Sequence, residues 1–256
     1  MSGLGSIRDR RDALLRGVPL LGRMIRPRMA SLLAKYLYLA EALERRRIEL
    51  VIDVGANVGQ FGQALRAVGY RGRILSFEPL EEAYRALTQV AARDGSWETV
   101  NSALGEDEGS ASLAVMKSSV FSSFHMPAAG AATAQFAEQN VVAAHQEVPV
   151  RRLDTVLEER SLRPLLARTM LKCDTQGHDR HVLEGLAWAS ELALLQIELS
   201  AVPVYEGTPT MGEMLEYVDG LGFAPILLSP INRGPDGSAI EFDYLGVNRA
   251  VAAGTG

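Results

Sequence analysis

Two neighbouring segments carry residues that could hold a nucleoside. The first, VIDVGANVGQF at residues 51–61, predicts a buried strand, a turn containing Gly55 and Gly59, and the start of a helix. The second is a strand at 74–77 that ends in Glu78. Glycine lets the backbone approach a ligand closely, because a side chain there would fill the space. An acid that ends the second strand is placed to accept hydrogen bonds from both ribose hydroxyls.

The charge at the turn indicates which nucleotide is bound. A dinucleotide site usually shows G-x-G-x-x-G and places a pyrophosphate at the helix N-terminus. Here the pattern is D-x-G-x-x-x-G, and the carboxylate of Asp53 would repel a pyrophosphate. The same carboxylate suits S-adenosylmethionine (SAM), which carries an ammonium and a sulfonium. We therefore predict SAM as the cofactor. A NAD-dependent oxidoreductase is the alternative, and it would bind NAD and not SAM.

The rest of the chain alternates between predicted strands and helices, recognised by apolar spacing and turn residues. The expected strands span 50–54, 73–77, 97–102, 170–173, 194–199, 224–229 and 240–248. The expected helices span 31–46, 58–68, 80–93, 179–186 and 210–220. This order predicts an α/β fold: a doubly wound, Rossmann-like sheet with a C-terminal β-hairpin and an N-terminal helical extension. It is the outline of a class I SAM-dependent methyltransferase.

In such an open sheet the ligand lies across the carboxyl ends of the strands. We therefore expect the cofactor contacts to follow the strands. The predicted cofactor-binding residues are Asp53, Gly55, Ala56, Asn57 and Gly59 at the methionine part, Glu78 and Pro79 at the ribose, Asn101, Ser102 and Ala103 at the adenine, and Asp174 near the reacting end.

The segment after the strand at 170–173 faces the transferring methyl in this fold. An alcohol acceptor has a high pKa, so a base assists its deprotonation in the transition state. His178 is the candidate at neutral pH, and the alternative is a surface imidazole at a helix cap. Asp174 and Glu198 end adjacent strands and are the other catalytic candidates. They could also bind Mg²⁺ through oxygen ligands; alternatively, Asp174 caps the helix that follows it.

The acceptor site is less clearly marked. Gln176 and Tyr205 follow two of the strands and are candidate substrate contacts. Ser122, Ser123 and His125 lie in a Ser- and Ala-rich stretch with little periodicity, 117–147, which we interpret as a lid or insertion. A flexible polar loop explains these serines equally well.

Length and composition limit the class of protein. A chain of 256 residues is long enough for one large α/β domain with an extension. We expect a basic helical extension over 1–47 and a SAM-dependent methyltransferase domain over 48–250. The single cysteine, Cys173, excludes an internal disulfide and fits a reducing compartment. No apolar run is long enough to span a bilayer or to form a secretory signal. We therefore expect a cytoplasmic protein.

The charge is unevenly distributed. Residues 1–47 hold 11 Lys/Arg and 4 Asp/Glu, whereas the remainder holds 15 Lys/Arg and 27 Asp/Glu. We interpret this arm as a solvated helical lid whose apolar face packs on the domain. The alternative is a basic, partly amphipathic arm that makes peripheral contact with the inner face of a membrane through residues 1–30. A homodimer through the N-terminal helices or through the lid at 117–147 is a further expectation. The acidic body argues against a nucleic-acid partner.

The ordered motifs resemble those of the FkbM-type methyltransferases. The matching pieces are VIDVGANVGQF at 51–61, SFEPL at 76–80, NSALG at 101–105, RLDTVL at 152–157, LKCDTQGHDRHVLEG at 171–185 and IELSAVPVYEG at 197–207. The resemblance implies a class I SAM-dependent O-methyltransferase acting on hydroxyls of sugars, glycolipids or secondary metabolites. Many relatives have Glu where Gln176 stands, which weakens the argument for a metal if that Glu is a ligand in them. N-methylation and a non-catalytic SAM-binding protein are the alternatives.

Overall fold

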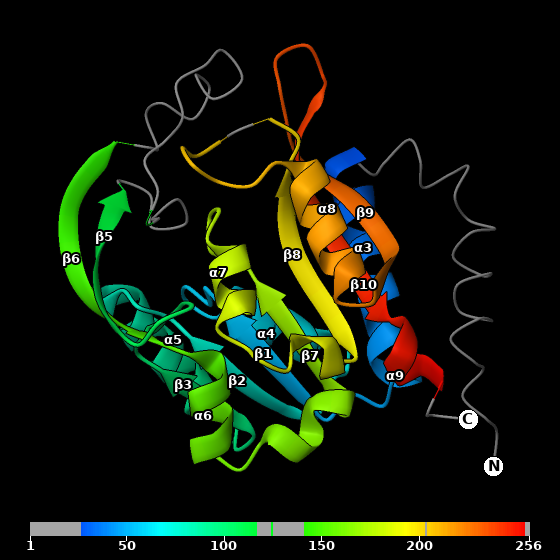
Figure 1. The fold of residues 1–256 in the computed structure, drawn as a ribbon, viewed down its shortest axis with the longest axis horizontal. Coiled ribbons are helices and arrows are strands. Elements are labelled where there is room, and N and C mark those ends of the chain that lie inside the picture. The colour runs from blue at the N-terminus through cyan, green and yellow to red at the C-terminus, as the bar shows by residue number, and fades with distance from the viewer. Residues whose placement is uncertain (1–26, 117–123, 125–140, 203, 254–256) are drawn as a thin grey trace.

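The computed structural model describes residues 27–116, 124, 141–202 and 204–253. A seven-stranded sheet lies at the centre, in the order β3-β2-β1-β7-β8-β10-β9 (Figure 1). Its strands are β1 (Leu50–Val54), β2 (Arg73–Phe77), β3 (Trp97–Val100), β7 (Thr169–Cys173), β8 (Leu194–Ser200), β9 (Phe223–Arg233) and β10 (Ala239–Asn248). The first five of these in sheet order run parallel, and β10 is antiparallel to both of its neighbours. The predicted doubly wound sheet with a C-terminal hairpin is confirmed.

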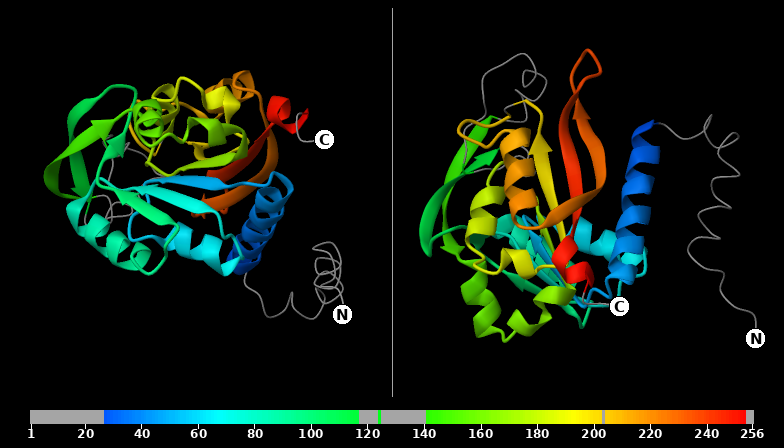
Figure 2. Two further views of the ribbon diagram at one scale, coloured as in Figure 1. Left: turned by 90° about the horizontal axis from the view of Figure 1, so that it is seen from below. Right: turned by 45° about the vertical axis from the view of Figure 1, so that its right-hand side comes forward.

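Helices cover both faces of this sheet (Figure 2). One face carries α3 (Pro27–Arg45), α4 (Gln60–Ala67) and α5 (Glu81–Ala91), and the other carries α6 (Leu153–Glu159), α7 (Asp179–Glu184) and α8 (Met211–Gly220). Short 3₁₀ helices lie at Arg163–Arg168 and Ala189–Glu191, and α9 spans Arg249–Ala253. Strands covered on both faces read as continuous apolar runs. Accordingly, every residue of β1 and β7 is buried.

A second, three-stranded sheet lies beside the first, in the order β4-β6-β5. Its strands are β4 (Ala103–Leu104), β5 (Gly109–Met116) and β6 (Val142–Arg151). The strand expected at 97–102 therefore ends at Val100, and β4 belongs to this other sheet. Residues 142–147, which we assigned to the end of a lid, are part of β6. Of the remainder of that stretch, the structure describes only residues 141 and 124.

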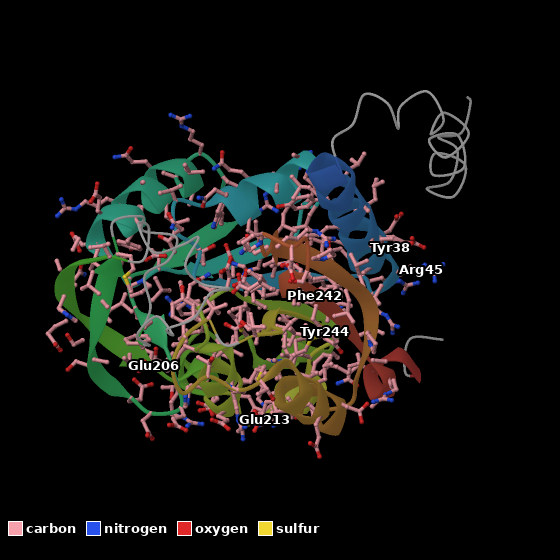
Figure 3. The ribbon with its side chains drawn as sticks, turned by 90° about the horizontal axis from the view of Figure 1, so that it is seen from above. Tyr38, Arg45, Glu206, Glu213, Phe242 and Tyr244 are labelled. Atoms are coloured by element: carbon pink, nitrogen blue, oxygen red, sulfur yellow. The ribbon has the colours of Figure 1, made fainter. Side chains whose placement is uncertain are left out.

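The helix α3 begins at Pro27, earlier than the position expected from apolar spacing. Proline is favoured at the first helical position because its missing N–H would have no partner there. The helix buries Leu39 completely and Leu43 to 4% exposure against the sheet. Figure 3 shows α3, with Tyr38 and Arg45, on one side of the sheet and α8, with Glu213, on the other. The helix is thus part of one layer of the fold.

The packing of α3 can be tested with two leucines of the same helix. Leu39 is fully buried, whereas Leu37 is 44% exposed. We expect Leu39→Ala to lower the free energy of unfolding by about 2–5 kcal/mol, because it leaves a cavity under the helix. Leu37→Ala should cost less than about 1 kcal/mol. Urea denaturation of both variants measures this, and equal losses would contradict the described packing of α3.

Candidate active site

A cavity of about 290 Å³ lies at the carboxyl ends of β1, β2 and β7. Its wall includes residues from the loops that follow these strands, from β4 and from α3. Predicted site residues in this wall are Gly55, Ala56, Asn57, Glu78, Pro79, Ser102, Ala103, Asp174, Gln176 and His178. The structure therefore brings most of the expected contacts to one place. Asp53, Gly59, Asn101, Glu198 and Tyr205 are not among the lining residues.

The turn after β1 has a backbone shape that depends on glycine. Gly55 has φ +72°, and a Cβ on it would lie 2.0 Å from the carbonyl oxygen of Asp174. Any larger residue would therefore push β1 and β7 apart at the mouth of the site. The amides of Gly55 and Ala56 both donate to the carbonyl of Phe77, which fixes the turn to the end of β2. Gly59, at φ +89°, contributes to the start of α4.

Glu78 is held rigidly at the cavity wall. One carboxylate oxygen accepts from the backbone amide of Asn57 at 2.8 Å, and the other accepts from that of Leu80 at 2.9 Å. The side chain is only 5% exposed, and burial raises the pKa of this carboxyl despite the two amide hydrogen bonds. Each oxygen retains a second lone pair. The carboxylate can therefore accept the two hydroxyls of a ribose while it also closes the turn after β1.

The Asp53 carboxylate is fully buried and does not face the cavity. It lies 3.0 Å from Lys172 Nζ and accepts a hydrogen bond from the hydroxyl of Ser76 at 3.2 Å. Burial alone would lower the pKa of Lys172, but the carboxylates of Asp53 and Asp174 together raise it. Lys172 is therefore charged, and it balances the charge of Asp53 inside the protein. The sequence argument treated Asp53 as the partner of a cationic ligand and did not consider this lysine.

The predicted adenine contacts divide into two groups. Ser102 and Ala103 line the cavity. The side-chain amide of Asn101 instead donates to the carbonyl oxygens of Glu78 and Pro79, at 2.9 and 3.1 Å. Its contribution is to hold the loop after β2 in shape.

Asp174 and Glu198 are joined by a third residue. The amide nitrogen Nε2 of Gln176 lies 3.2 Å from a carboxylate oxygen of each acid. Asp174 is also 3.5 Å from Lys172 Nζ, and its side chain is 40% exposed. Glu198 is partly buried, and this desolvation together with the carboxylate of Asp174 raises its pKa well above the usual range. The Glu198 carboxyl therefore keeps its proton to a higher pH than an ordinary glutamic acid does.

This arrangement does not fit the expected Mg²⁺. Magnesium requires charged or carbonyl oxygen ligands at about 2.0–2.1 Å. Between these two acids stands an amide nitrogen, which has hydrogens to donate and no lone pair for a cation. Within the described residues, the group whose ligand atoms have metal spacing is a different one: Glu106, His181 and Glu184. We therefore derive no catalytic step through a metal.

His178 precedes α7 and faces the cavity. Its ring centroid lies 4.8 Å from that of Phe124 and 4.5 Å from that of His181. Gly105, across the site, would place a Cβ 3.5 Å from His178 Nε2. The imidazole is thus partly enclosed by rings and a glycine. His178 is the N-cap residue of α7, as the alternative interpretation expected, but its side chain makes no capping hydrogen bond. Ser122, Ser123 and His125, the predicted acceptor contacts of the lid, lie outside the described residues.

Several lining residues were not predicted. Lys35 and Tyr36 of α3 reach the cavity, and Lys35 pairs with Asp243 of β10 at 2.7 Å. The position of Lys172 inside an apolar strand was a signal that could have predicted its role, because a lysine is rarely buried unless it is paired. Nothing in the local sequence around Lys35 indicates a contact with Asp243, because the two residues lie 208 positions apart in the chain.

The strand order, the glycine turn and the acid after β2 together define a class I, Rossmann-like methyltransferase fold. Residues 53–225 match the model of the methyltransferase FkbM domain. The chain belongs to this family and is a SAM-dependent methyltransferase. No curated protein matches the chain.

Solved structures show more distant likeness. An rRNA methylase from Streptococcus thermophilus is 14% identical, with a TM-score of 0.42, over 88% of this chain and 97% of that one. Magnesium protoporphyrin IX methyltransferase from Synechocystis PCC 6803, solved with bound SAM, is 10% identical, with a TM-score of 0.44, over 97% and 99%. Fibrillarin from Aeropyrum pernix, also solved with SAM, is 9% identical, with a TM-score of 0.40, over 78% and 66%.

Removing the Glu78 carboxylate should weaken cofactor binding. We expect Glu78→Ala to lower the affinity for S-adenosylhomocysteine by about 10- to 100-fold, because hydrogen bonds to a charged group contribute about 1.5–3 kcal/mol. Isothermal titration calorimetry measures this. Glu98→Ala is the matched control, since Glu98 is an exposed acid on the adjacent strand β3. Unchanged affinity in Glu78→Ala would contradict the ribose assignment.

The raised pKa of Glu198 predicts a pH-dependent stability. A folded-state pKa above the unfolded value means that the native state binds more protons, so stability falls as pH rises through this range. We expect Glu198→Gln to be more stable than the wild type at pH 8 by an amount on the order of 1 kcal/mol. The difference should shrink towards pH 3, below the ordinary pKa of a glutamic acid, where the wild-type acid is protonated in both states. Urea denaturation at the two pH values measures both differences, and a constant difference would contradict a raised pKa of Glu198 in the folded protein.

Proposed function

We propose that the protein transfers the methyl group of SAM to a hydroxyl of a sugar, glycolipid or other secondary metabolite. The observation that carries this proposal is the position of His178 in the wall of the same cavity as Glu78 and the turn after β1. An imidazole titrates near neutral pH and can take the proton of an alcohol as the new bond forms. Asp174, partly exposed in the same wall, can accept a hydrogen bond from the acceptor.

The residues present fit SAM at this cavity. Glu78 offers its two oxygens to the ribose, Ser102 and Ala103 flank the adenine, and Gly55, Ala56 and Asn57 border the methionine part. Gly55 lets the turn after β1 lie against the backbone of Asp174, because a Cβ there would be 2.0 Å from the Asp174 carbonyl oxygen. When bound, SAM supplies an electrophilic methyl carbon on a sulfonium.

The chain's own residues then have two tasks. The first is alignment, since in-line displacement needs the acceptor oxygen close behind the methyl carbon, and such positioning can lower the barrier by roughly 7–11 kcal/mol. Asp174 and Gln176 supply polar groups for this at the cavity wall. The second task is proton removal. As the O–CH₃ bond forms and the S–CH₃ bond breaks, the hydroxyl proton passes to the imidazole of His178, and the products are the methyl ether and S-adenosylhomocysteine.

Part of the wall belongs to α3. Lys35 and Tyr36 line the cavity, so the helix that precedes β1 helps to shape the space. Lys35 forms an ion pair with Asp243. The other carboxylate oxygen of Asp243 accepts a hydrogen bond from the side-chain amide of Gln196 at 3.3 Å. A hydroxylated acceptor would meet both polar and aromatic groups on this side. This mixture suits a sugar or glycolipid better than a purely apolar molecule.

Within the described residues, no helix has both the length and the apolar character needed to cross a bilayer.

The base assignment can be tested with two histidines. We expect His178→Ala to reduce turnover by roughly 10²- to 10⁴-fold, the usual contribution of a general base. The affinity for S-adenosylhomocysteine should remain within about threefold of wild type. His145→Ala is the matched control, because His145 is an exposed residue of β6 outside the cavity wall.

The assay follows release of S-adenosylhomocysteine with panels of sugar, glycolipid, phenol and amine acceptors. Methylation of alcohols by the wild type and the His145 variant, but not by the His178 variant, is the expected result. Full turnover in His178→Ala would remove it as the base. Methylation of amines alone would favour N-methyl transfer. Binding of S-adenosylhomocysteine without turnover on any acceptor would favour a non-catalytic protein.

A further inference from the structure

The side-chain amide of Gln176 is the link between the acids of the candidate active site. Its Nε2 atom donates to Asp174 Oδ1 and to Glu198 Oε2, both at 3.2 Å. Its carbonyl oxygen Oε1 accepts from the hydroxyl of Tyr205 at 2.6 Å. One amide thus uses both of its polar ends to join three side chains from different loops and strands. Asp174 is the member of this group that lines the cavity beside Gln176.

The backbone is built to hold that amide in place. Gln176 has φ +53°, in the left-handed region that non-glycine residues rarely adopt. The next residue, Gly177, has φ +94°, and a Cβ on it would lie 2.4 Å from the Thr208 side chain. Two successive left-handed residues turn the chain sharply between β7 and α7. Backbone strain of this kind persists when the surrounding contacts require it, as the three hydrogen bonds of Gln176 do here.

The position between the acids is where a cation would have to sit. Two carboxylates that approach a common point repel each other unless a positive charge or a hydrogen-bond donor stands between them. A divalent cation would fill that place with charge. Gln176 fills it with two N–H donors, and the neighbouring charge of Lys172 acts on Asp174 from the other side, at 3.5 Å. The amide therefore satisfies the same electrostatic requirement without a metal.

We propose that Gln176 takes the place of a metal ion in this site: its amide holds the Asp174 carboxylate against the cavity, so that the acceptor is positioned without a cation. The role of Asp174 towards the acceptor rests on the proposed methyl transfer. The convergence of the two carboxylates on the amide does not, and it can be tested without any acceptor. Gln176 is a positioning residue, and the group it positions is Asp174.

The decisive variant is Gln176→Glu, which keeps the side-chain length and replaces the donor with a third carboxylate. Three acids that converge on one point form an oxygen-rich site for a divalent cation. We expect the wild-type protein to bind Mn²⁺ only weakly, and Gln176→Glu to bind Mn²⁺ at least about tenfold more tightly than the wild type does. Electron paramagnetic resonance of free Mn²⁺, in a titration of the full-length protein, measures this.

Gln63→Glu is the matched control, because it makes the same chemical change at an exposed residue of α4 that does not line the cavity. Tight Mn²⁺ binding by the wild type that is lost in Glu198→Gln would overturn the proposal, because a cation would then belong between the acids. So would a Gln176→Glu variant that binds Mn²⁺ no better than Gln63→Glu, because the carboxylates would not converge.

A second variant covers the case in which Gln176→Glu does not fold. Gln176→Met has a similar length but no donor, so Asp174 loses its tether. With an acceptor found in the screen above, we expect kcat to fall by about 10- to 100-fold while the KM for SAM changes by less than about threefold. An equally large change in kcat and in the KM for SAM would contradict a positioning role, and so would an unchanged kcat. Loss of S-adenosylhomocysteine binding by the wild type would instead count against the proposed function itself.

Discussion

The buried ion pair between Asp53 and Lys172 is the interaction on which the site depends. It joins β1, near its carboxyl end, to the adjacent strand β7, where the two residues are register partners. Lys172 also donates to the carbonyl oxygens of Val54 and Gly55, at 3.3 and 3.2 Å, and so holds the start of the turn after β1. Removing one partner of such a pair typically costs about 3–5 kcal/mol, because the other charge is left buried and uncompensated. On the β2 side, Asp53 accepts from Ser76, which in turn accepts from the indole N–H of Trp97.

That pair sets the electrostatics of the cavity as well as its shape. Because Asp53 is neutralised internally, Asp174 and Glu78 are the acids that remain at the wall. They differ in use. Glu78 is fixed by two backbone amides and serves as a hydrogen-bond acceptor, whereas Asp174 is more exposed and lies between a lysine and an amide. Farther from the cavity, burial raises the pKa values of Glu198 and Asp179.

The local patterns predicted the parallel part of the sheet well, for a physical reason. Strands covered on both faces are mostly apolar, so β1, β2, β7 and β8 stand out as short, nearly continuous apolar runs. The edge elements were harder to predict. β6 is exposed along much of its length, and its polar and alanine-rich start lacks the alternation that identifies a half-buried strand. The length of β9 was also underestimated, because its pairing with β10 continues through register shifts that have no local signature.

The sequence alone determined the family, the fold class and the residues that follow each strand, because glycine, an acid after the second strand and apolar runs act locally. Only the tertiary structure decided which charges meet. The partner of Asp53 lies on a strand that is distant in the chain, and Lys35 reaches Asp243 and the cavity only because α3 packs against β9, the neighbour of β10 in the sheet. The same holds for Gln176, whose amide joins Asp174, Glu198 and Tyr205. Hydrogen bonds and ion pairs act over a few ångströms in space, and the distance between residues along a chain does not reveal which of them will come that close.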